Sequence, residues 1–145
     1  MKAYRNPANV HAPMAAYTHQ IEVQEPARWL VMSGQLGKME DGTVAEDPMR
    51  QLAVAFDNIA RNLHAAQMEM GDLVKLTIYL VGDFDVQQRR AVISTHLKEP
   101  WPCVTLLMVA ALADPVYKVE IDAWAAQGGM AATPPSMTAS DRAPL

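Results

Sequence analysis

Several features that define large classes of proteins are missing from this sequence. It contains a single cysteine, Cys103, which excludes a disulfide within the chain and favours a reducing compartment. No stretch reaches the ~18 consecutive apolar residues that span a bilayer. Residues 1–20 hold no apolar core of a signal peptide. We therefore expect a soluble, cytoplasmic protein that has no membrane partner.

Basic clusters and metal-binding patterns are scarce as well. The chain carries 12 Lys and Arg against 16 Asp and Glu, a net charge of −4, and it has no basic block to bind nucleic-acid phosphates. Its four histidines form no HxxxH or HExxH pair. The glycines of segment 33–38 lack the spacing of a phosphate loop. These absences argue against a nucleic-acid partner, a zinc site and a nucleotide site.

The composition that is present indicates a folded domain with a core. Hydrophobic residues make up 50% of the 145 residues and charged residues 19%. Beyond residue 126 the composition changes, because Gly, Pro and Ser become frequent and no hydrophobic period continues. We predict a single domain over residues 1–126 and a C-terminal tail over residues 127–145.

The hydrophobic spacing predicts an α+β fold, a mixed β-sheet with two helices packed on one face. Segments 16–23 and 29–33 are expected to form a hairpin after an irregular segment 1–14. Asp47 begins a helix expected over residues 48–70 and ended by Gly71. The remaining expected elements are a strand over 73–81, a helix from Asp83 or Asp85 to about Leu97, and strands over 103–112 and 117–124.

The strand over 73–81 has two different faces. Leu76 and Ile78 point to one side, whereas Thr77 and Tyr79 point to the other. If the helices cover the apolar side, the opposite side still holds Tyr79 and apolar residues of the last two strands. A small chain with such a face open is expected to associate with itself.

Two carboxylates share one side of the last predicted strand. Glu120 and Asp122 alternate with Val119, Ile121 and Ala123, so both side chains face away from the apolar side. A pair of carboxylates in this arrangement suits a general base or a group that orients water. A solvated strand face explains the same pattern without any chemistry.

Short motifs follow one another in a defined order from about Asn6 to Ala125. They are Asn6-Pro7, Ala12-Pro13, Tyr17, Ser33-Gly34-Gln35, Asp57-Asn58-Ile59, the run from Gly71 to Thr77, the run from Val109 to Leu112, and the run from Val119 to Ala123. In order and spacing, the chain resembles the RidA (YjgF) family of small imine and enamine deaminases. The tail from residue 127 onward lies outside this resemblance.

The resemblance implies a chorismate-mutase-like α+β fold and a homotrimer with ligand clefts between subunits. Active members of the family hydrolyse 2-aminoacrylate and related enamines or imines to 2-keto acids and ammonia, without a metal or an organic cofactor. The expected partners are therefore a small-molecule ligand and further copies of the chain.

The family's site residues can be carried over position by position. Glu120 matches the glutamate that orients or activates water for attack on the imine carbon. Tyr17 matches a tyrosine that lines the cleft from the neighbouring subunit, and Ser33 and Gly34 match a cleft-lining pair. Leu106 stands where a backbone N–H assists binding of the substrate carboxylate.

The family's carboxylate-binding arginine is missing from this chain. Its pattern, Pro-x-Arg-[Ser/Thr], corresponds to the stretch from Pro102 to Thr105, so Val104 occupies the position of the arginine. A valine cannot pair with a carboxylate, and loss of a bidentate contact costs roughly 2–5 kcal/mol. Turnover of 2-aminoacrylate by the standard contacts is therefore not expected.

Other residues are candidates for an altered cleft. Arg89, on the second predicted helix, could supply a replacement cation, and so could His96 or Lys98. Trp101 could wall an apolar or aromatic pocket, against the alternative that it packs in the interior. Met108 could line the same pocket or fill a gap in the core or an interface.

Three functions remain open at this point. The first is a hydrolase of imines or enamines, with a substrate larger or less anionic than 2-aminoacrylate and with Glu120 acting on water. The second is a trimer that binds a small metabolite without turnover, and the third is a scaffold whose surface carries the function. A cation that reaches the cleft near Val104, together with Glu120 facing the cavity, would favour the enzyme. A cleft filled by side chains or by the C-terminal tail would favour the scaffold.

Overall fold

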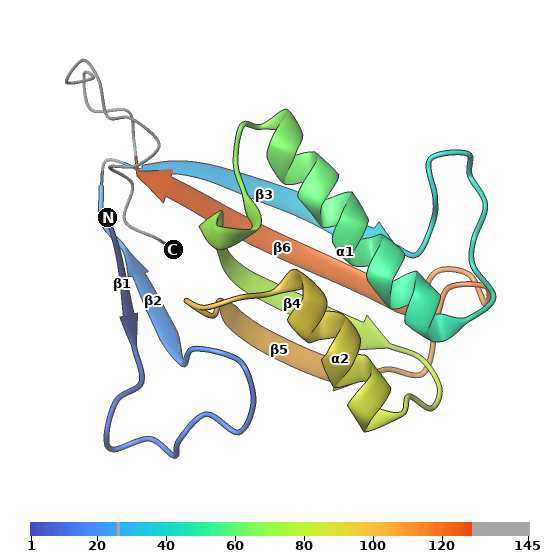
Figure 1. Cartoon of the computed structure of the whole chain (residues 1–145), viewed down its shortest axis with the longest axis horizontal. Coiled ribbons are helices and arrows are strands. Elements are labelled where there is room, and N and C mark those ends of the chain that lie inside the picture. Colours follow the sequence, from blue (N-terminus) through green and yellow to red (C-terminus); the bar gives the residue numbers. More distant parts are fainter. Residues whose placement is uncertain (26, 129–145) are drawn as a thin grey trace.

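Two β-sheets and two α-helices make up the structure, a computed structural model that describes residues 1–25 and 27–128. In chain order the elements are β1 (Lys2–Arg5), β2 (Gln20–Val23), β3 (Ala27–Leu36), α1 (Pro48–Ala65), the 3₁₀ turn η1 (Met70–Asp72), β4 (Leu73–Leu80), α2 (Val86–His96), β5 (Cys103–Met108) and β6 (Val119–Gly128). The larger sheet has the strand order β3-β6-β4-β5, and α1 and α2 lie across one of its faces (Figure 1). Only β4 and β5 run parallel, so the sheet is mixed and the predicted fold class is confirmed.

Helix α1 begins where the sequence predicts. The Asp47 carboxylate accepts a hydrogen bond from the backbone N–H of Met49 at 3.1 Å, and Pro48 occupies the first turn. One side of the helix is fully buried against the sheet, at residues three and four apart: Leu52, Phe56, Ile59 and Leu63. This face fixes the helix on the sheet.

The end of α1 differs from the prediction. The helix ends at Ala65, not at Met70, and Gly71 lies inside η1. The left-handed residue that follows the helix is Gln67, with a φ of 56°. The expected glycine cap is therefore wrong, because the chain turns into the core at Met68 before it reaches the glycine.

The strand partners near the N-terminus also differ from the prediction. The expected irregular segment contains β1, which pairs with β2 in a separate antiparallel sheet. Strand β3 pairs with β6, so β2 and β3 do not form the expected hairpin. The alternation of side chains marked both strands but carried no information about their partners, because pairing depends on contacts distant in sequence.

The two faces of the larger sheet have opposite characters. Strand β4 buries Leu76 and Ile78 under the helices and leaves Thr77 and Tyr79 half-buried on the other side. We call that other side the open face. It also carries exposed side chains of β3 and β6: Trp29, Val31 and Trp124. The prediction of an uncovered, partly apolar face is confirmed for this chain.

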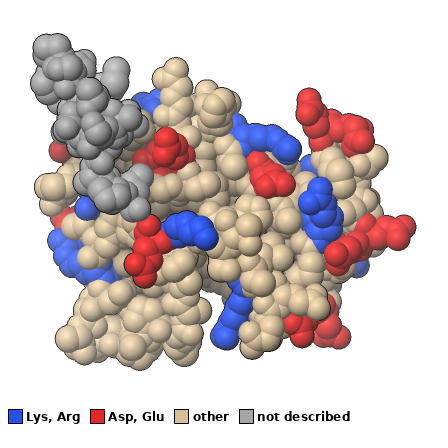
Figure 2. All heavy atoms as spheres, in the orientation of Figure 1, with Lys and Arg blue, Asp and Glu red and all other residues tan. Residues whose placement is uncertain are grey.

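The last strand runs further than expected, and the surface is mixed in charge. Strand β6 continues through Gln127 and Gly128, and the rest of the predicted tail lies outside the described residues. On the helix side, Lys and Arg alternate with Asp and Glu and no large patch of one sign forms (Figure 2). Within residues 1–25 and 27–128, neither helix is long and apolar enough to cross a membrane.

Candidate active site

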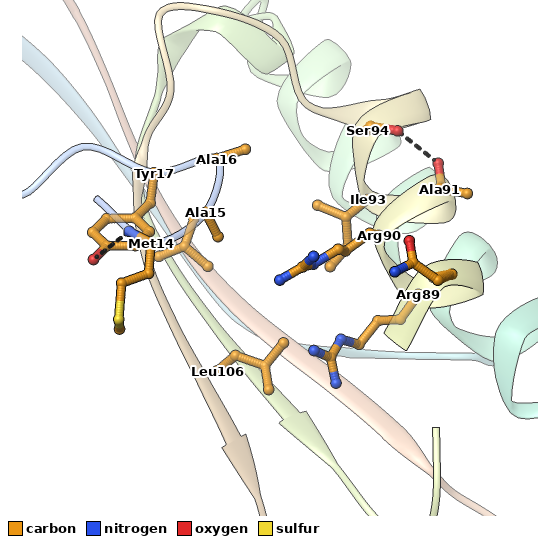
Figure 3. A pocket seen from close by; sticks show the side chains of 12 residues that line it. Met14, Ala15, Ala16, Tyr17, Arg89, Arg90, Ala91, Ile93, Ser94 and Leu106 are labelled. Carbon is orange, nitrogen blue, oxygen red and sulfur yellow. Dashed lines mark hydrogen bonds between the residues drawn. The ribbon is translucent and has the colours of Figure 1, made fainter. Parts of the chain in front are cut away.

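An open cleft of about 750 Å³ lies between helix α2, strand β5 and the segment 14–17 (Figure 3). Its volume falls in the range of roughly 300–1,000 Å³ that holds drug-sized ligands. The cleft brings together four residues proposed from the sequence, namely Tyr17, Arg89, Val104 and Leu106. Residues far apart in the chain thus meet at the edge of the sheet, because β5 is the last strand of the sheet and α2 packs beside it.

Thr18 holds the segment 14–17 against the start of β5. Its backbone N–H donates to the carbonyl of Pro102 at 3.1 Å, and its Oγ1 donates to the carbonyl of Trp101 at 2.7 Å. The side chain of Asn6 accepts a hydrogen bond from the N–H of His19 at 2.8 Å. Thr18 is buried, so its two bonds are partly shielded from water and hold Tyr17 in the cleft.

Tyr17 lines the α2–β5 cleft of its own chain. That it also lines a cleft from the neighbouring subunit, as the resemblance implied, stays a prediction. The structure places Tyr17 beside Val104 and Leu106 of its own chain, because Thr18 anchors it to the residues just before β5. Its hydroxyl accepts a hydrogen bond from the N–H of Met14 at 3.4 Å.

Glu120 lies on the open face and packs over Gly34. A Cβ placed on Gly34 would overlap the Glu120 carboxylate, so only a glycine allows this approach. Strand β3 is irregular between Met32 and Gln35, and this bulge brings Gly34 over β6. Ser33, next to it, is exposed. The sequence-predicted residues Glu120, Ser33 and Gly34 therefore form a second group.

The two groups lie on opposite faces of the sheet. In the register of β4 and β5, Leu106 is level with the buried Ile78, so it faces the helices. Glu120 is level with Tyr79, whose side chain points the other way. Side chains level with each other on neighbouring strands share a face. One copy of the chain therefore cannot bring the Glu120 carboxylate to a ligand held in the α2–β5 cleft.

Two further sequence candidates lie outside the cleft. Trp101 packs against the core, and its indole N–H donates to the Glu99 carboxylate at 3.3 Å. Met108 is 54% exposed at the end of β5 and does not line the cleft. Neither residue forms a wall of the pocket.

The other two candidate cations, His96 and Lys98, make contacts outside the cleft. His96 stacks on Phe56 with ring centroids 5.0 Å apart and lies 3.3 Å from the Asp57 carboxylate. Lys98 donates to the carbonyl of Ser94 at 2.9 Å. Of the three candidate cations, Arg89 is the one in the cleft.

Sequence reasoning missed a second arginine and part of the apolar wall. Arg90, Ile93 and Met14 line the cleft as well. A signal was present in the spacing, because Arg89, Ile93 and Leu97 follow one another at intervals of four and share one helix face. This spacing groups Ile93 with Arg89, but it contains no signal for Arg90.

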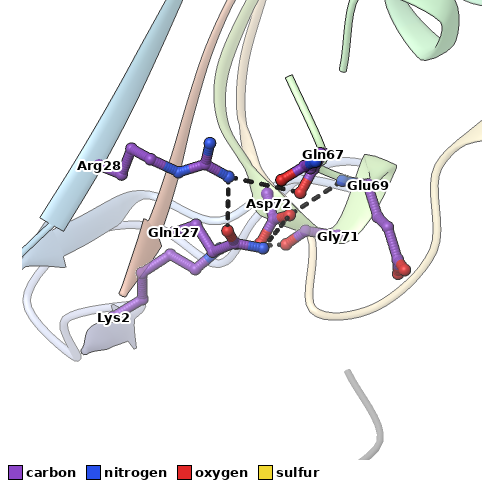
Figure 4. A network of polar contacts seen from close by, with 7 residues as sticks. All are labelled: Lys2, Arg28, Gln67, Glu69, Gly71, Asp72 and Gln127. Atoms are coloured by element: carbon purple, nitrogen blue, oxygen red, sulfur yellow. Dashed lines mark hydrogen bonds and ion pairs between the residues drawn. The ribbon is translucent and has the colours of Figure 1, made fainter. Parts of the chain in front are cut away.

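A polar network at the other end of the molecule has a structural role. The buried Asp72 carboxylate accepts hydrogen bonds from the backbone N–H of Glu69 at 2.9 Å and from Gln127 at 3.3 Å, and the Lys2 ammonium lies 3.8 Å away (Figure 4). Arg28 donates to the Gln127 side chain at 2.8 Å. Burial lowers the pKa of Lys2, and Asp72 partly offsets that effect. These groups satisfy one another and tie β1, β3 and β6 to the turn before β4.

The other reactive groups of the described chain do not converge into a site. Within residues 1–25 and 27–128, no three His, Cys, Asp or Glu side chains are placed to hold a metal ion. Cys103 is partly buried at the start of β5, and this burial raises the pKa of its thiol. The α2–β5 cleft and the Glu120–Gly34 contact remain the candidate site.

Comparison with models of protein families shows to which family the chain belongs. A family model described as endoribonuclease L-PSP matches residues 8–127 of this chain. The chain belongs to this family, which includes RidA and YjgF. The match covers every element from β2 to β6 and all residues of both groups described above, so the RidA fold and the candidate site come from the same stretch of sequence.

A curated member of the RidA family matches over a shorter stretch. The RutC family protein YjgH of Escherichia coli (strain K12) is 33% identical over 73 residues, which are 50% of this chain and 55% of that protein. The chain therefore matches about half the length of this relative, and the relative does not transfer an activity.

Solved structures of RidA-family proteins share the fold over most of their length. A Rid-family protein of unknown function from Yersinia pestis, YyfB, has a TM-score of 0.74 and 22% identity over 86% of this chain and 97% of that chain. RidA from Psychrobacter sp. has a TM-score of 0.63 and 29% identity over 79% and 90% of the two chains. E. coli TdcF with bound serine has a TM-score of 0.64 and 22% identity over 82% and 91%.

Proposed function

We propose that the protein is a hydrolase of imines or enamines that acts as a homotrimer and needs no cofactor. It converts the C=N group of its substrate to a keto group and releases ammonia. The α2–β5 cleft of one copy binds the substrate, and Glu120 of another copy acts on water.

The observation that carries this proposal is the Glu120 carboxylate over Gly34. Among the described residues, no hydrogen bond or ion pair engages Glu120, whereas the buried Asp72 carboxylate is fully used. A carboxylate that the protein leaves free at a close backbone approach can accept a proton from water. Its position on the strand also matches the water-activating glutamate that the family resemblance implies.

The opposite faces of the sheet support a site shared between copies. The cleft lies on the helix side of the edge strand β5, and Glu120 lies on the open face. The open face exposes 47% of Trp29, 57% of Val31 and 46% of Trp124, a surface suited to contact with another copy. We propose that association through this face brings Glu120 of one copy near the edge strand of the next.

The reaction then needs few groups. An enamine first tautomerises to the imine. Glu120 takes a proton from water as the water oxygen bonds to the imine carbon, and the imine nitrogen gains a proton from solvent. Glu120 then returns its proton to the amino group of the carbinolamine. The C–N bond breaks as the hydroxyl proton is lost to solvent, and a ketone and ammonia leave. Water is the only co-reactant, so the atoms balance without an oxidant or reductant.

RNA cleavage, which the family model's description names, is not proposed for this chain. Its net charge is −4, and the face shown in Figure 2 mixes acidic and basic side chains. Binding to the phosphate backbone requires clustered Lys and Arg.

The test is a coupled deaminase assay. An L-amino-acid oxidase acting on phenylalanine generates an imino acid larger than 2-aminoacrylate in solution, and keto-acid release is followed with and without the protein. We expect acceleration by the wild type and a loss of roughly 100- to 10,000-fold in Glu120→Gln, the usual contribution of a general base. Glu46→Gln, an exposed glutamate that does not line the cleft, is the matched control and should keep full activity.

The outcomes separate the enzyme from the alternative. The alternative is a trimer of the same family that binds a small metabolite or serves as a scaffold without turnover. No acceleration of any enamine or imine by a correctly assembled trimer would reject the hydrolase and favour that alternative. Activity that survives Glu120→Gln would reject the role of Glu120.

A further inference from the structure

Two arginine side chains in the α2–β5 cleft have no protein partner. Arg89 and Arg90 project from α2 toward the segment 14–17 and Leu106 (Figure 3). Among residues 1–25 and 27–128, neither guanidinium donates a hydrogen bond or forms an ion pair, and the Nε of Arg89 is buried without a partner. A buried, unpaired N–H of a charged group costs free energy, which an anionic ligand would recover.

The charge of the cleft is entirely positive. None of the residues that line it is an aspartate or a glutamate. The two guanidinium groups therefore repel each other with no protein carboxylate between them, although the chain as a whole has a net charge of −4. A site of this kind selects a ligand with a negative group.

Most of the remaining wall of the cleft is apolar, and Tyr17, Gln87 and Ser94 add polar groups to it. Val104 and Leu106 form the floor on β5, and Ile93 and Met14 stand at the sides. The cleft volume of about 750 Å³ exceeds what a three-carbon acid would fill. An apolar body attached to the negative group would cover these side chains and exclude water from the ion pair.

We propose that Arg89, with Arg90 beside it, binds the carboxylate of an imino or enamino acid whose side chain is large and apolar. Arginine is suited to this because its planar guanidinium donates two parallel hydrogen bonds to a carboxylate. Val104, in the position where the family resemblance places an arginine, then forms part of the apolar floor. This inference deepens the proposed function and rests on it for the reaction, but the binding step can be tested alone.

The test measures binding of a product-type keto acid by calorimetry. The probes are 2-oxo-4-phenylbutanoate and 4-phenylbutan-2-one, which differ only in a carboxylate against a methyl group. We expect the wild type to bind the keto acid at least about 10-fold more tightly than the ketone. This difference is the contribution of one charge-assisted contact to the affinity. Equal affinity for the two probes, or no binding of either, overturns the inference.

The variants assign the effect to the arginines. Arg89→Gln should weaken binding of the keto acid roughly 10- to 100-fold and leave the affinity for the ketone unchanged. The double variant Arg89→Gln with Arg90→Gln should remove the preference for the keto acid over the ketone. Arg50→Gln, an exposed arginine on α1, removes the same charge elsewhere and should bind as the wild type does. Unchanged keto-acid affinity in the double variant overturns the inference.

Measurements of thermal stability and of turnover separate a loss of binding from unfolding and from a failure of the proposed reaction. Because the side chain of Arg89 makes no hydrogen bond or ion pair with the described chain, Arg89→Gln should melt no lower than the wild type, so lost binding cannot be ascribed to unfolding. Arginine-dependent binding without any deaminase activity would support this inference and reject the proposed reaction. Deaminase activity on an imino acid that is unaffected in the double variant would reject this inference and support the proposed reaction.

Discussion

At the level of single residues, Gly34 controls where the Glu120 carboxylate lies. Any side chain at this position would occupy the space of the carboxylate. Displacement of a catalytic group by about 1 Å costs on the order of 100-fold in rate. The glycine is therefore part of the proposed site through Glu120, without touching the substrate.

This gives a prediction for Gly34→Ala. The turnover number should fall by roughly 100-fold, because the carboxylate must rotate away from the added methyl group. Affinity for 2-oxo-4-phenylbutanoate should stay unchanged, because Arg89 binds it. Gly128→Ala is the control, since a Cβ there meets nothing within 4 Å. A Gly34→Ala enzyme with normal turnover would contradict the role of the contact.

Cys103 is the only thiol of the chain, and its surroundings make it unreactive. Burial raises the pKa of this thiol above its ordinary value of 9.0, while the Lys75 ammonium and a backbone bond from Ile21 oppose the shift. The thiolate is the reactive species, so less of it is present at neutral pH.

We predict that Cys103 reacts with iodoacetamide more slowly than glutathione does at pH 8. The rate should rise with pH through a midpoint above 9.0, because the folded state holds the thiol protonated. Unfolding in urea should restore the rate of an ordinary thiol. A midpoint below that value in the folded protein would show an activated cysteine.

At the level of elements, the end of helix α1 shows how local geometry overrides a sequence signal. The N–H of Met68 donates to the carbonyl of Leu63 at 2.8 Å, and the N–H of Gln67 donates to that of His64 at 2.9 Å. These two bonds form a Schellman motif, which usually has a glycine in the left-handed position. Here Gln67 takes that position, because Met68 must turn into the core.

The strained position predicts a stabilising substitution. Gln67→Gly should raise the free energy of unfolding by about 0.5–1 kcal/mol, because glycine adopts a positive φ without steric cost. The Gln67 carbonyl, which accepts from Arg28, is kept in the variant. Urea denaturation measures the change, and Gln67→Ala should be neutral by comparison. A glycine variant less stable than the wild type would show that the glutamine side chain contributes.

At the level of the whole molecule, the open face determines assembly. Trp29 and Trp124 meet edge to face with centroids 6.4 Å apart, and Val31 is level with Trp124 on the neighbouring strand. These side chains remain about half exposed, although β4 and β6 bury the opposite face of the same sheet under the helices. A second copy that covers them would remove this apolar surface from water.

The proposed trimer predicts a matched pair of variants. Val31→Glu should yield monomers in sedimentation velocity and lower keto-acid release by at least about 100-fold, because the proposed site needs two copies. Val116→Glu adds the same charge at an exposed valine outside the open face and should keep the trimer and its activity. An active monomer would contradict the shared site.

The sequence by itself determined most of the elements and the family, and it singled out Glu120 and Arg89 as candidate residues. Asp47 and the spacing of apolar residues located α1, alternation located β4, and the motif around Glu120 pointed to the carboxylate. These features are local, since each depends on neighbours within one turn or one strand. The predictions failed where local signals compete with distant contacts, as at the pairing of β2 and at the end of α1.

Only the tertiary structure decided which of these residues meet. It placed Tyr17 beside Val104 through two bonds of Thr18, put Arg89 and Arg90 in the same cleft, and set Glu120 on the opposite face. The physical reason is that the order of strands in a sheet is fixed by packing between segments far apart in the chain. A sequence shows which face of its own strand a side chain takes, but its neighbours across the sheet exist only once the strands have paired.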